Sequence, residues 1–260
     1  MKKAILITVR TGSTRLPQKA LLDIEGQTTI AHLIEGVKLS KKADEIILCT
    51  TELEEDDVLC RIAENRKIKY FRGSTSDKLE RWKGACEKFG IDFFVTADGD
   101  DIFCEAELID LAFEQYERTN ADFIQGKDVI CGSFTYGIKT EALNKVCEIK
   151  DTSDTEMMWV YFTDTGLFNV QDLENVPTIY KRDDIRMTLD YDDDFIFFRD
   201  VIKELGEEGY YECNYGLLRN IVSLIDRKPD IAKINYHLQE VWSENQKQNT
   251  KLVIKNEKHK

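Results

Sequence analysis

The first half of the chain alternates short apolar runs with segments whose apolar residues recur at helical spacing. Ile30, Leu33, Ile34 and Val37, for example, follow the spacing of a helix that faces a core. Alternation of this kind predicts a largely parallel sheet with helices on both faces. We expect strands at 3–9, 45–50, 67–71, 92–97 and 121–125, and helices at 28–39, 56–65, 76–89 (with Ser76 as the N-cap) and 105–117.

The second half is less regular. We expect helices near 141–148 and 154–162, a strand at 185–189 that ends in Asp190, and helices at 192–205 and 215–225. Three prolines and no low-complexity run leave no obvious linker. We therefore expect a single domain over 1–245, with an inserted subregion at 128–182 that serves substrate binding or dimerisation, and a flexible tail at 246–260.

Composition removes several classes of function. The 36 basic and 49 acidic residues give a net charge of −13, whereas a sequence-independent nucleic-acid binder needs a cationic surface. No apolar run approaches the roughly 18 residues of a membrane span. Seven cysteines without a C-x-x-C pair, and only three histidines, argue against zinc and disulfides. We expect reduced thiols and a cytoplasmic protein.

The first candidate site is the loop at residues 10–19, directly after the first strand. Arg10, Arg15 and Lys19 place three cations beside Gly12 and the hydroxyl of Ser13. Loops at the carboxyl ends of parallel strands are where open α/β sheets bind ligands, and fixed donors with cations suit a polyphosphate. The pattern is not a Walker A loop. The alternative is a solvated basic loop.

Acidic residues follow two other predicted strands. Asp98, Asp100 and Asp101 come after the strand at 92–97, and Asp190 ends the strand at 185–189. Carboxylates from two strands that face a cationic loop suit a Mg²⁺–nucleoside triphosphate site. The alternative for Asp98–Asp101 is an acidic turn. Asp192, Asp193 and Asp194 are typical of the first turn of a helix, where capping and the helix dipole favour acids.

Arg72 follows the third strand, in the run Arg72-Gly-Ser-Thr-Ser-Asp77. It falls at the same edge of the predicted sheet, where its guanidinium could reach a nucleobase or a phosphate. A plain turn before an N-capped helix explains the run equally well.

The ordered set of motifs resembles a known family. Arg10-x-Gly-Ser-Thr-Arg15-Leu-Pro-x-Lys19-x-Leu is similar to the N-terminal signature of the cytidylyltransferases that make CMP-activated acidic sugars, the acylneuraminate and 3-deoxy-manno-octulosonate enzymes. The resemblance is strongest to their relatives named for spore-coat polysaccharide biosynthesis. Further matches follow in order: Phe71-Arg-Gly-Ser with Asp77, Leu79 and Arg81; Gly99-Asp100 before 102–110; Arg186-Met-Thr-Leu-Asp190 with Asp194; and Lys228-Pro-Asp-Ile with Asn235.

The resemblance implies a nucleotide-diphospho-sugar transferase (GT-A-like) fold, an α/β architecture with a mixed, mostly parallel sheet between helices. It implies that Arg10, Gly12, Ser13, Arg15 and Lys19 hold the phosphates of CTP and that Arg72 lies near the base. Asp100 and Asp190 would hold Mg²⁺, and with Arg15 and Lys19 they would be the catalytic residues. The implied reaction transfers CMP from CTP to an acidic sugar and releases pyrophosphate, in a homodimer.

Departures from the family leave alternatives open. Asp98 stands where the octulosonate enzymes have Gln, and a carboxylate can accept from the cytosine amine or from guanine N1–H and N2–H. Residues 128–182 lack the acceptor segments of those enzymes. A phosphate or phosphonate acceptor therefore stays possible. Asp98-x-Asp100 also matches the D-x-D pattern of metal-dependent glycosyltransferases, and a non-catalytic nucleotide-binding module is a further alternative.

Overall fold

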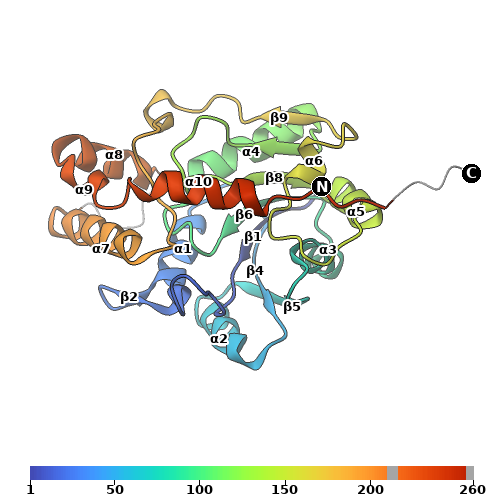
Figure 1. The fold of residues 1–260 in the computed structure, drawn as a ribbon, viewed down its shortest axis with the longest axis horizontal. Helices are drawn as coiled ribbons and strands as arrows, with labels where there is room; N and C mark the ends of the chain where they lie inside the picture. The colour runs from blue at the N-terminus through green and yellow to red at the C-terminus, as the bar shows by residue number, and fades with distance from the viewer. Residues whose placement is uncertain (210–215, 256–260) are drawn as a thin grey trace, which may run out of the picture.

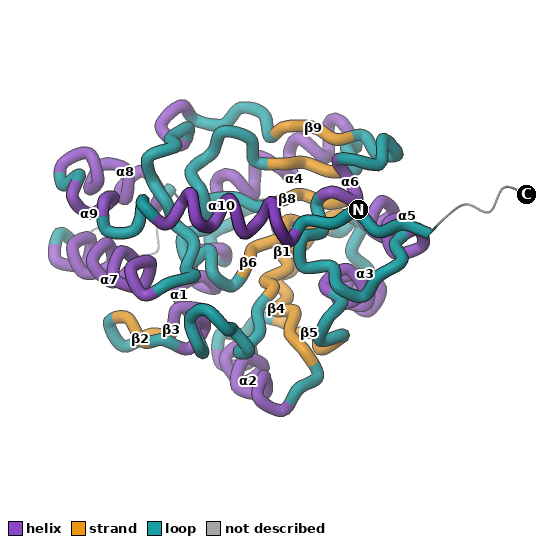
Figure 2. Tube along the Cα trace, viewed as in Figure 1, coloured by secondary structure: helices purple, strands orange, loops and turns teal. Residues whose placement is uncertain are grey.

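A computed structural model describes residues 1–209 and 216–255. Within this part of the chain the centre is a seven-stranded sheet in the order β5-β4-β1-β6-β8-β7-β9 (Figures 1 and 2). Neighbouring strands pair in parallel from β5 to β6 and between β7 and β9, while β8 runs antiparallel to both β6 and β7. The mixed, mostly parallel sheet is confirmed. The strands are β1 (Lys3–Thr8), β4 (Glu45–Thr51), β5 (Lys69–Gly73), β6 (Phe93–Asp98), β7 (Phe123–Gln125), β8 (Tyr136–Lys139) and β9 (Val170–Asp172).

Two apolar cores lie on opposite faces of the sheet. Side chains alternate along β1, so that Ile5 and Ile7 enter one core and Ala4 and Leu6 enter the other. The first core includes α1 (Thr29–Val37), α2 (Asp57–Asn65), α4 (Ala106–Thr119), α7 (Asp192–Glu207), α8 (Leu217–Arg227) and α9 (Asp230–Lys233). The second includes α3 (Lys78–Phe89), α5 (Thr140–Ile149) and α6 (Val160–Thr163). The expected covering of both faces by helices is confirmed.

Short elements connect this framework. They are the 3-10 turns η1 (Lys19–Leu21), η2 (Glu54–Asp56) and η3 (Thr178–Tyr180), and a small hairpin of β2 (Asp23–Ile24) and β3 (Gln27–Thr28). The last helix, α10 (Leu238–Asn249), buries none of its residues in either core. Figure 1 shows it crossing in front of the sheet.

Several expected boundaries differ from the structure. The expected helix at 154–162 is reduced to α6, because the Thr155 hydroxyl bonds the Asp77 carboxylate (3.0 Å) and holds the preceding residues against the start of α3. The N-cap of α3 is Asp77, which accepts from the Glu80 amide, and not Ser76. The expected helix at 215–225 begins at Leu217, and Tyr215 lies outside the described residues.

Two regions of the expected domain plan can be located in the structure. Residues 128–182 contribute β8 and β9 to the central sheet, so this subregion is built into the same framework. The expected flexible tail begins inside α10, and beyond the helix Lys255 N donates to Ile149 O (2.8 Å). Residues 256–260 lie outside the described part.

Two expectations from composition can be compared with the described chain. None of the helices in residues 1–209 and 216–255 has the length and apolar character needed to cross a bilayer. The cysteines within these residues are free thiols, and all but Cys131 are buried; Cys213 lies outside them.

Candidate active site

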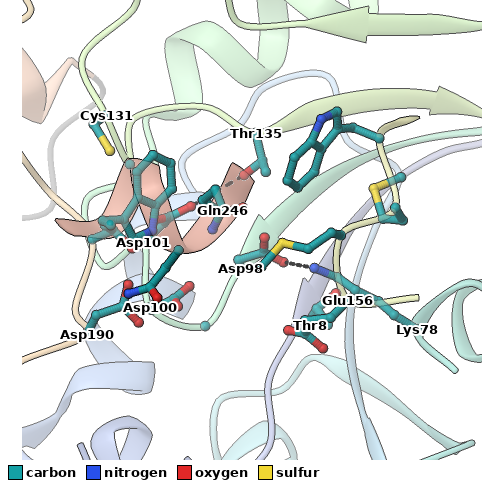
Figure 3. Close-up of a pocket in the computed structure, with 18 of the residues that line it drawn as sticks. Thr8, Lys78, Asp98, Asp100, Asp101, Cys131, Thr135, Glu156, Asp190 and Gln246 are labelled. Atoms are coloured by element: carbon teal, nitrogen blue, oxygen red, sulfur yellow. Dashed lines mark hydrogen bonds and ion pairs between the residues drawn. The ribbon is translucent and has the colours of Figure 1, made fainter. Parts of the chain in front are cut away.

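A cavity of about 1130 Å³ lies at the carboxyl ends of β1 and β6. Its lining comes from loop 10–19, residues 98–101, the connection between β7 and β8, residues 156–160, residues 188–190 and one face of α10. Figure 3 shows its acidic residues in two groups, with Asp100, Asp101 and Asp190 on one side and Asp98 and Glu156 on the other. This edge of the sheet is where the strand order predicts a ligand site.

Loop 10–19 contributes every residue predicted from it. Arg10, Gly12, Ser13, Arg15 and Lys19 all line the cavity. The loop is anchored at its base by Asp56, whose carboxylate accepts from the Thr11 amide (2.8 Å) and the Thr11 hydroxyl (2.7 Å). A buried carboxylate with two local donors fixes the direction in which the loop leaves β1.

Lys19 lies between the two carboxylates that were predicted to hold a metal. Its Nζ is 2.7 Å from Asp100 Oδ2 and 3.0 Å from Asp190 Oδ1. Arg15 also contacts Asp190 Oδ1, at 2.6 Å, and its guanidinium lies over the Tyr191 ring. The structure therefore brings four predicted residues, far apart in sequence, into one charge cluster.

Burial and charge set the protonation of this cluster. Burial lowers the pKa of Lys19, but the charges of Asp100 and Asp190 outweigh it and hold this pKa above its usual range. Burial likewise raises the pKa of Asp100, and the ammonium of Lys19 more than offsets it, so that the net pKa lies below the usual range. The lysine and the carboxylate are both charged at neutral pH.

Asp190 is positioned by side chains and loops, and the expected strand at 185–189 is not formed. The segment is extended, but its backbone bonds run to two loops: Met187 N donates to Cys131 O (2.9 Å) and Leu189 N to Asp100 O (2.9 Å). Asp194 accepts from the Asp190 amide (2.9 Å) and caps the start of α7, as expected for an acid in a first turn.

Buried Arg186 holds this corner together. Its guanidinium contacts Asp194 at 3.0 Å, and Asp190 Oδ2 lies 3.6 Å away. Neither Arg186 nor Asp194 has any exposed side-chain surface. Because an unpaired buried charge is costly, the pairing ties Asp190 to the start of α7.

Asp98 is close to Asp100 in sequence but has a different partner. Its Oδ1 lies 3.0 Å from Nζ of Lys78, the first residue of α3. Burial raises the pKa of Asp98, and Asp100 adds to the effect, while Lys78 offsets part of it. Sequence reasoning missed Lys78. A lysine in the first turn of a helix opposes the helix dipole, and that unfavourable position was the available signal of a partner.

Arg72 is not brought to the cavity. Its guanidinium donates to Thr51 O (2.9 Å) and Leu53 O (2.8 Å) and pairs with Asp57 (2.5 Å), so that it supports the connection from β4 to α2. Arg72 is therefore not among the residues that line the cavity, and its expected position near a base has no support from its contacts. Arg81, from the same motif, lines the cavity instead, and its Nε has no hydrogen-bond partner among the described residues.

The residues of the cluster fit a divalent cation. Carboxylate oxygens are the ligands that Mg²⁺ prefers, and Asp100 and Asp190 already converge on one positive charge. Asp190 Oδ2 is buried and has no hydrogen-bond partner among the described residues. The described chain holds no group of three or more acidic, histidine or cysteine side chains that could hold a metal ion, so an ion at Asp100 and Asp190 would need further ligands from a phosphate and water.

The chain is similar to known proteins both in sequence and in fold. Residues 4–219 match the family model described as Cytidylyltransferase. Uncharacterized protein MJ1063 of Methanocaldococcus jannaschii is 31% identical over 242 residues, which are 92% of this chain and 97% of that protein. Spore coat polysaccharide biosynthesis protein SpsF of Bacillus subtilis is 25% identical over 87% of this chain and 95% of its own.

Solved structures agree on the fold. A cytidylyltransferase from Leptospira borgpetersenii superposes with a TM-score of 0.79 and 24% identity, over 89% of this chain and 97% of that one. A CMP:2-keto-3-deoxy-manno-octonic acid synthetase, solved in complex with CTP, superposes with a TM-score of 0.61 and 13% identity, over 78% of this chain and 99% of that one. With the family model spanning most of the chain, and with the charge cluster at the carboxyl edge of the sheet, the protein belongs to the cytidylyltransferase family and is a CTP-dependent nucleotidyltransferase.

Proposed function

We propose that the protein transfers CMP from CTP to a hydroxyl of an acidic sugar and releases pyrophosphate, as a step in making a surface polysaccharide. The observation that carries this proposal is Lys19, which lies between Asp100 and Asp190 at the end of a cationic loop. Relatives named for spore-coat polysaccharide biosynthesis and for 3-deoxy-manno-octulosonate transfer support the acceptor class.

The triphosphate end of the site is built from loop 10–19. Arg10, Arg15 and Lys19 supply positive charge where negative charge grows on the leaving pyrophosphate, and Ser13 adds a hydroxyl donor. Nucleotidyl transfer needs little covalent help from the protein, so positioning and charge are the main contributions. Asp100 and Asp190 would hold Mg²⁺, which when bound withdraws charge from the phosphate oxygens.

The base end of the site is built from Asp98 and Lys78. Cytosine presents an amine donor beside two acceptors, N3 and O2. A carboxylate next to an ammonium offers an acceptor and a donor that complement this edge. Guanine can also be read by such a pair, so the nucleotide comparison below must include GTP.

The proposal is tested by measuring pyrophosphate release from each of the four nucleoside triphosphates with Mg²⁺. The acceptors are 3-deoxy-manno-octulosonate, N-acetylneuraminate and a phosphonate. We expect release with CTP that requires a sugar acid. Turnover only with the phosphonate would reassign the acceptor. Release of a nucleoside phosphate from a sugar nucleotide, without pyrophosphate, would point to a glycosyltransferase.

Two substitutions test whether the carboxylates that face Lys19 are needed for turnover. Asp100→Asn and Asp190→Asn remove one carboxylate charge each, and we expect turnover to fall on the order of 10²–10³-fold while the protein still folds, by analogy with the loss of an oxyanion donor. The matched control is Asp193→Asn, a partly exposed acid three residues from Asp190 whose carboxylate lies beside His237. Near-normal turnover of both variants at saturating Mg²⁺ would refute the assignment.

The expected homodimer is a separate part of the proposal. Sedimentation equilibrium of the purified protein measures the mass in solution directly, and we expect twice the chain mass of 30.2 kDa. A monomer with full turnover would remove the dimer from the proposal and leave the chemistry unchanged.

A further inference from the structure

Helix α10 forms one wall of the cavity although the family match ends at residue 219. The lining residues of the helix include Gln239, Trp242, Ser243 and Gln246, which recur at three- and four-residue spacing and so lie on one face. Residues of the opposite face, such as Glu240 and Glu244, are exposed. Figure 3 shows Gln246 on this helix, between the two acidic groups. The helix therefore presents a defined surface to the cavity.

The chemistry of this surface differs from that of the rest of the cavity. The half-buried residues that face inward are amides, a hydroxyl and an indole: Gln239, Trp242, Ser243, Asn245 and Gln246. The one charged residue of α10 that lines the cavity, Lys247, is exposed. Phosphates call for cations, and loop 10–19 supplies them on the other side. Amides beside an indole instead suit a neutral group that offers several hydroxyls and some C–H surface.

The helix is fastened beside Asp190. Gln239 accepts from Arg186 at 3.2 Å, Asn245 donates to the Tyr191 hydroxyl at 3.3 Å, and the Arg186 guanidinium lies over the Trp242 ring. These contacts connect α10 to the residues on either side of Asp190. The proposed base contacts, Asp98 and Lys78, are on β6 and α3 and pair with each other. The α10 face is thus fixed beside Asp190, where the proposed reaction would place the phosphate that is attacked.

We propose that the inward face of α10 binds the hydroxyl-bearing tail of the sugar-acid acceptor and so determines acceptor specificity. The inference rests on the proposed function, since it assumes that a sugar acid occupies the cavity with CTP. In this arrangement Trp242 packs against the carbon skeleton of the tail, and Gln246 bonds its hydroxyls. These residues select the acceptor and take no part in the chemical step.

The test compares acceptors with and without the tail. In Trp242→Ala and Gln246→Ala we expect the KM for 3-deoxy-manno-octulosonate to rise on the order of tenfold, the effect of one or two lost contacts. The affinity for CTP, measured by calorimetry, stays within about twofold. With 3-deoxy-2-keto-hexonate, which has the same acid end but two carbons fewer, the variants and the parent chain have similar KM values.

Glu244→Ala is the matched control, since Glu244 is exposed on the opposite face of the same helix. We expect this variant to leave the KM for each of the two acids and the affinity for CTP unchanged. Thermal melting checks that each variant is folded. A loss of CTP affinity equal to the loss for the acceptor, or an equal loss with both acids, would overturn the inference and leave the proposed function intact. Absence of pyrophosphate release by the parent chain with any sugar acid would instead refute the proposed function, and the inference with it.

Discussion

The two sides of the cavity are supported in different ways. Loop 10–19 and residues 98–101 extend directly from β1 and β6, two central strands paired along their whole length. The opposite side, made of residues 185–191 and α10, has no strand behind it and depends on buried Arg186. On the first side, many backbone hydrogen bonds hold the site residues in place. On the second side, the ion pair and hydrogen bonds of one guanidinium do so. We therefore expect a substitution to reduce the free energy of unfolding less on the first side than on the second.

The largest effect is expected from Arg186→Met. The variant leaves Asp194 buried without its charge partner, which costs about 3–5 kcal/mol in the free energy of unfolding. Chemical denaturation measures the loss. The control is Arg199→Met, whose ion pair with Asp200 is on the surface and contributes less than about 1 kcal/mol. Equal losses in the two variants would show that Arg186 does not support its side of the cavity.

A smaller effect is expected from Asp56→Asn on the first side. The Asp56 carboxylate accepts from the amide and hydroxyl of both Thr11 and Thr51, and an amide can replace only one of its two oxygens. We expect a loss of about 1–3 kcal/mol in the free energy of unfolding and a several-fold rise in the KM for CTP. Asp57→Asn is the control, because Asp57 pairs with Arg72 at the surface.

Asp56 also gives this prediction a pH dependence. Burial raises the pKa of its carboxyl, but the hydrogen bonds from Thr51 and Thr11 outweigh burial and hold the pKa below its usual range. The carboxylate therefore stabilises the fold above about pH 4, and this contribution is lost as the pH falls through the folded-state pKa. Asp56→Asn should lose less stability than the parent chain on acidification. Parallel pH curves for the two proteins would contradict this account.

The smallest effect is expected from His32→Gln. His32 is buried on α1, and its Nε2 donates to Ile24 O at 3.0 Å. Burial lowers the pKa of His32, so the unfolded chain takes up a proton first and stability falls as the pH drops below about 6.5. An amide cannot take up that proton, so the parent chain should lose more stability than the variant between pH 7.5 and 5.5. Urea denaturation at both pH values measures the difference.

Sequence reasoning predicted the first side of the cavity well because its information is local. A loop after an apolar run, with three cations in ten residues, specifies both its place and its chemistry. Asp190 was placed correctly beside Asp100, although the strand assumed to carry it is an extended segment bonded to loops. Apolar residues in 185–189 reflect burial, and burial alone does not distinguish a strand from such a segment.

The second side could not be predicted because its contacts join distant residues. The hydrogen bond between Arg186 and Gln239 joins residues 53 positions apart, and no local sequence pattern predicts it. Helix α10 also lacks an apolar stripe, since it covers a cavity and not a core. The position of Arg72 away from the cavity has a related cause. Its motif is present, but a guanidinium has several donors, and here they bond to backbone carbonyls of the β4–α2 connection.

The ammonium of Lys19 has a consequence for the order of binding. Before any nucleotide arrives it already balances the two acids that face it, at 2.7 and 3.0 Å. A free divalent ion would have to compete with this internal counter-ion and gain nothing for displacing it. A triphosphate that carries its own metal offers the lysine new anionic oxygens in exchange. If the site binds CTP and Mg²⁺ as proposed, we therefore expect the metal and the nucleotide to enter it together, as one complex.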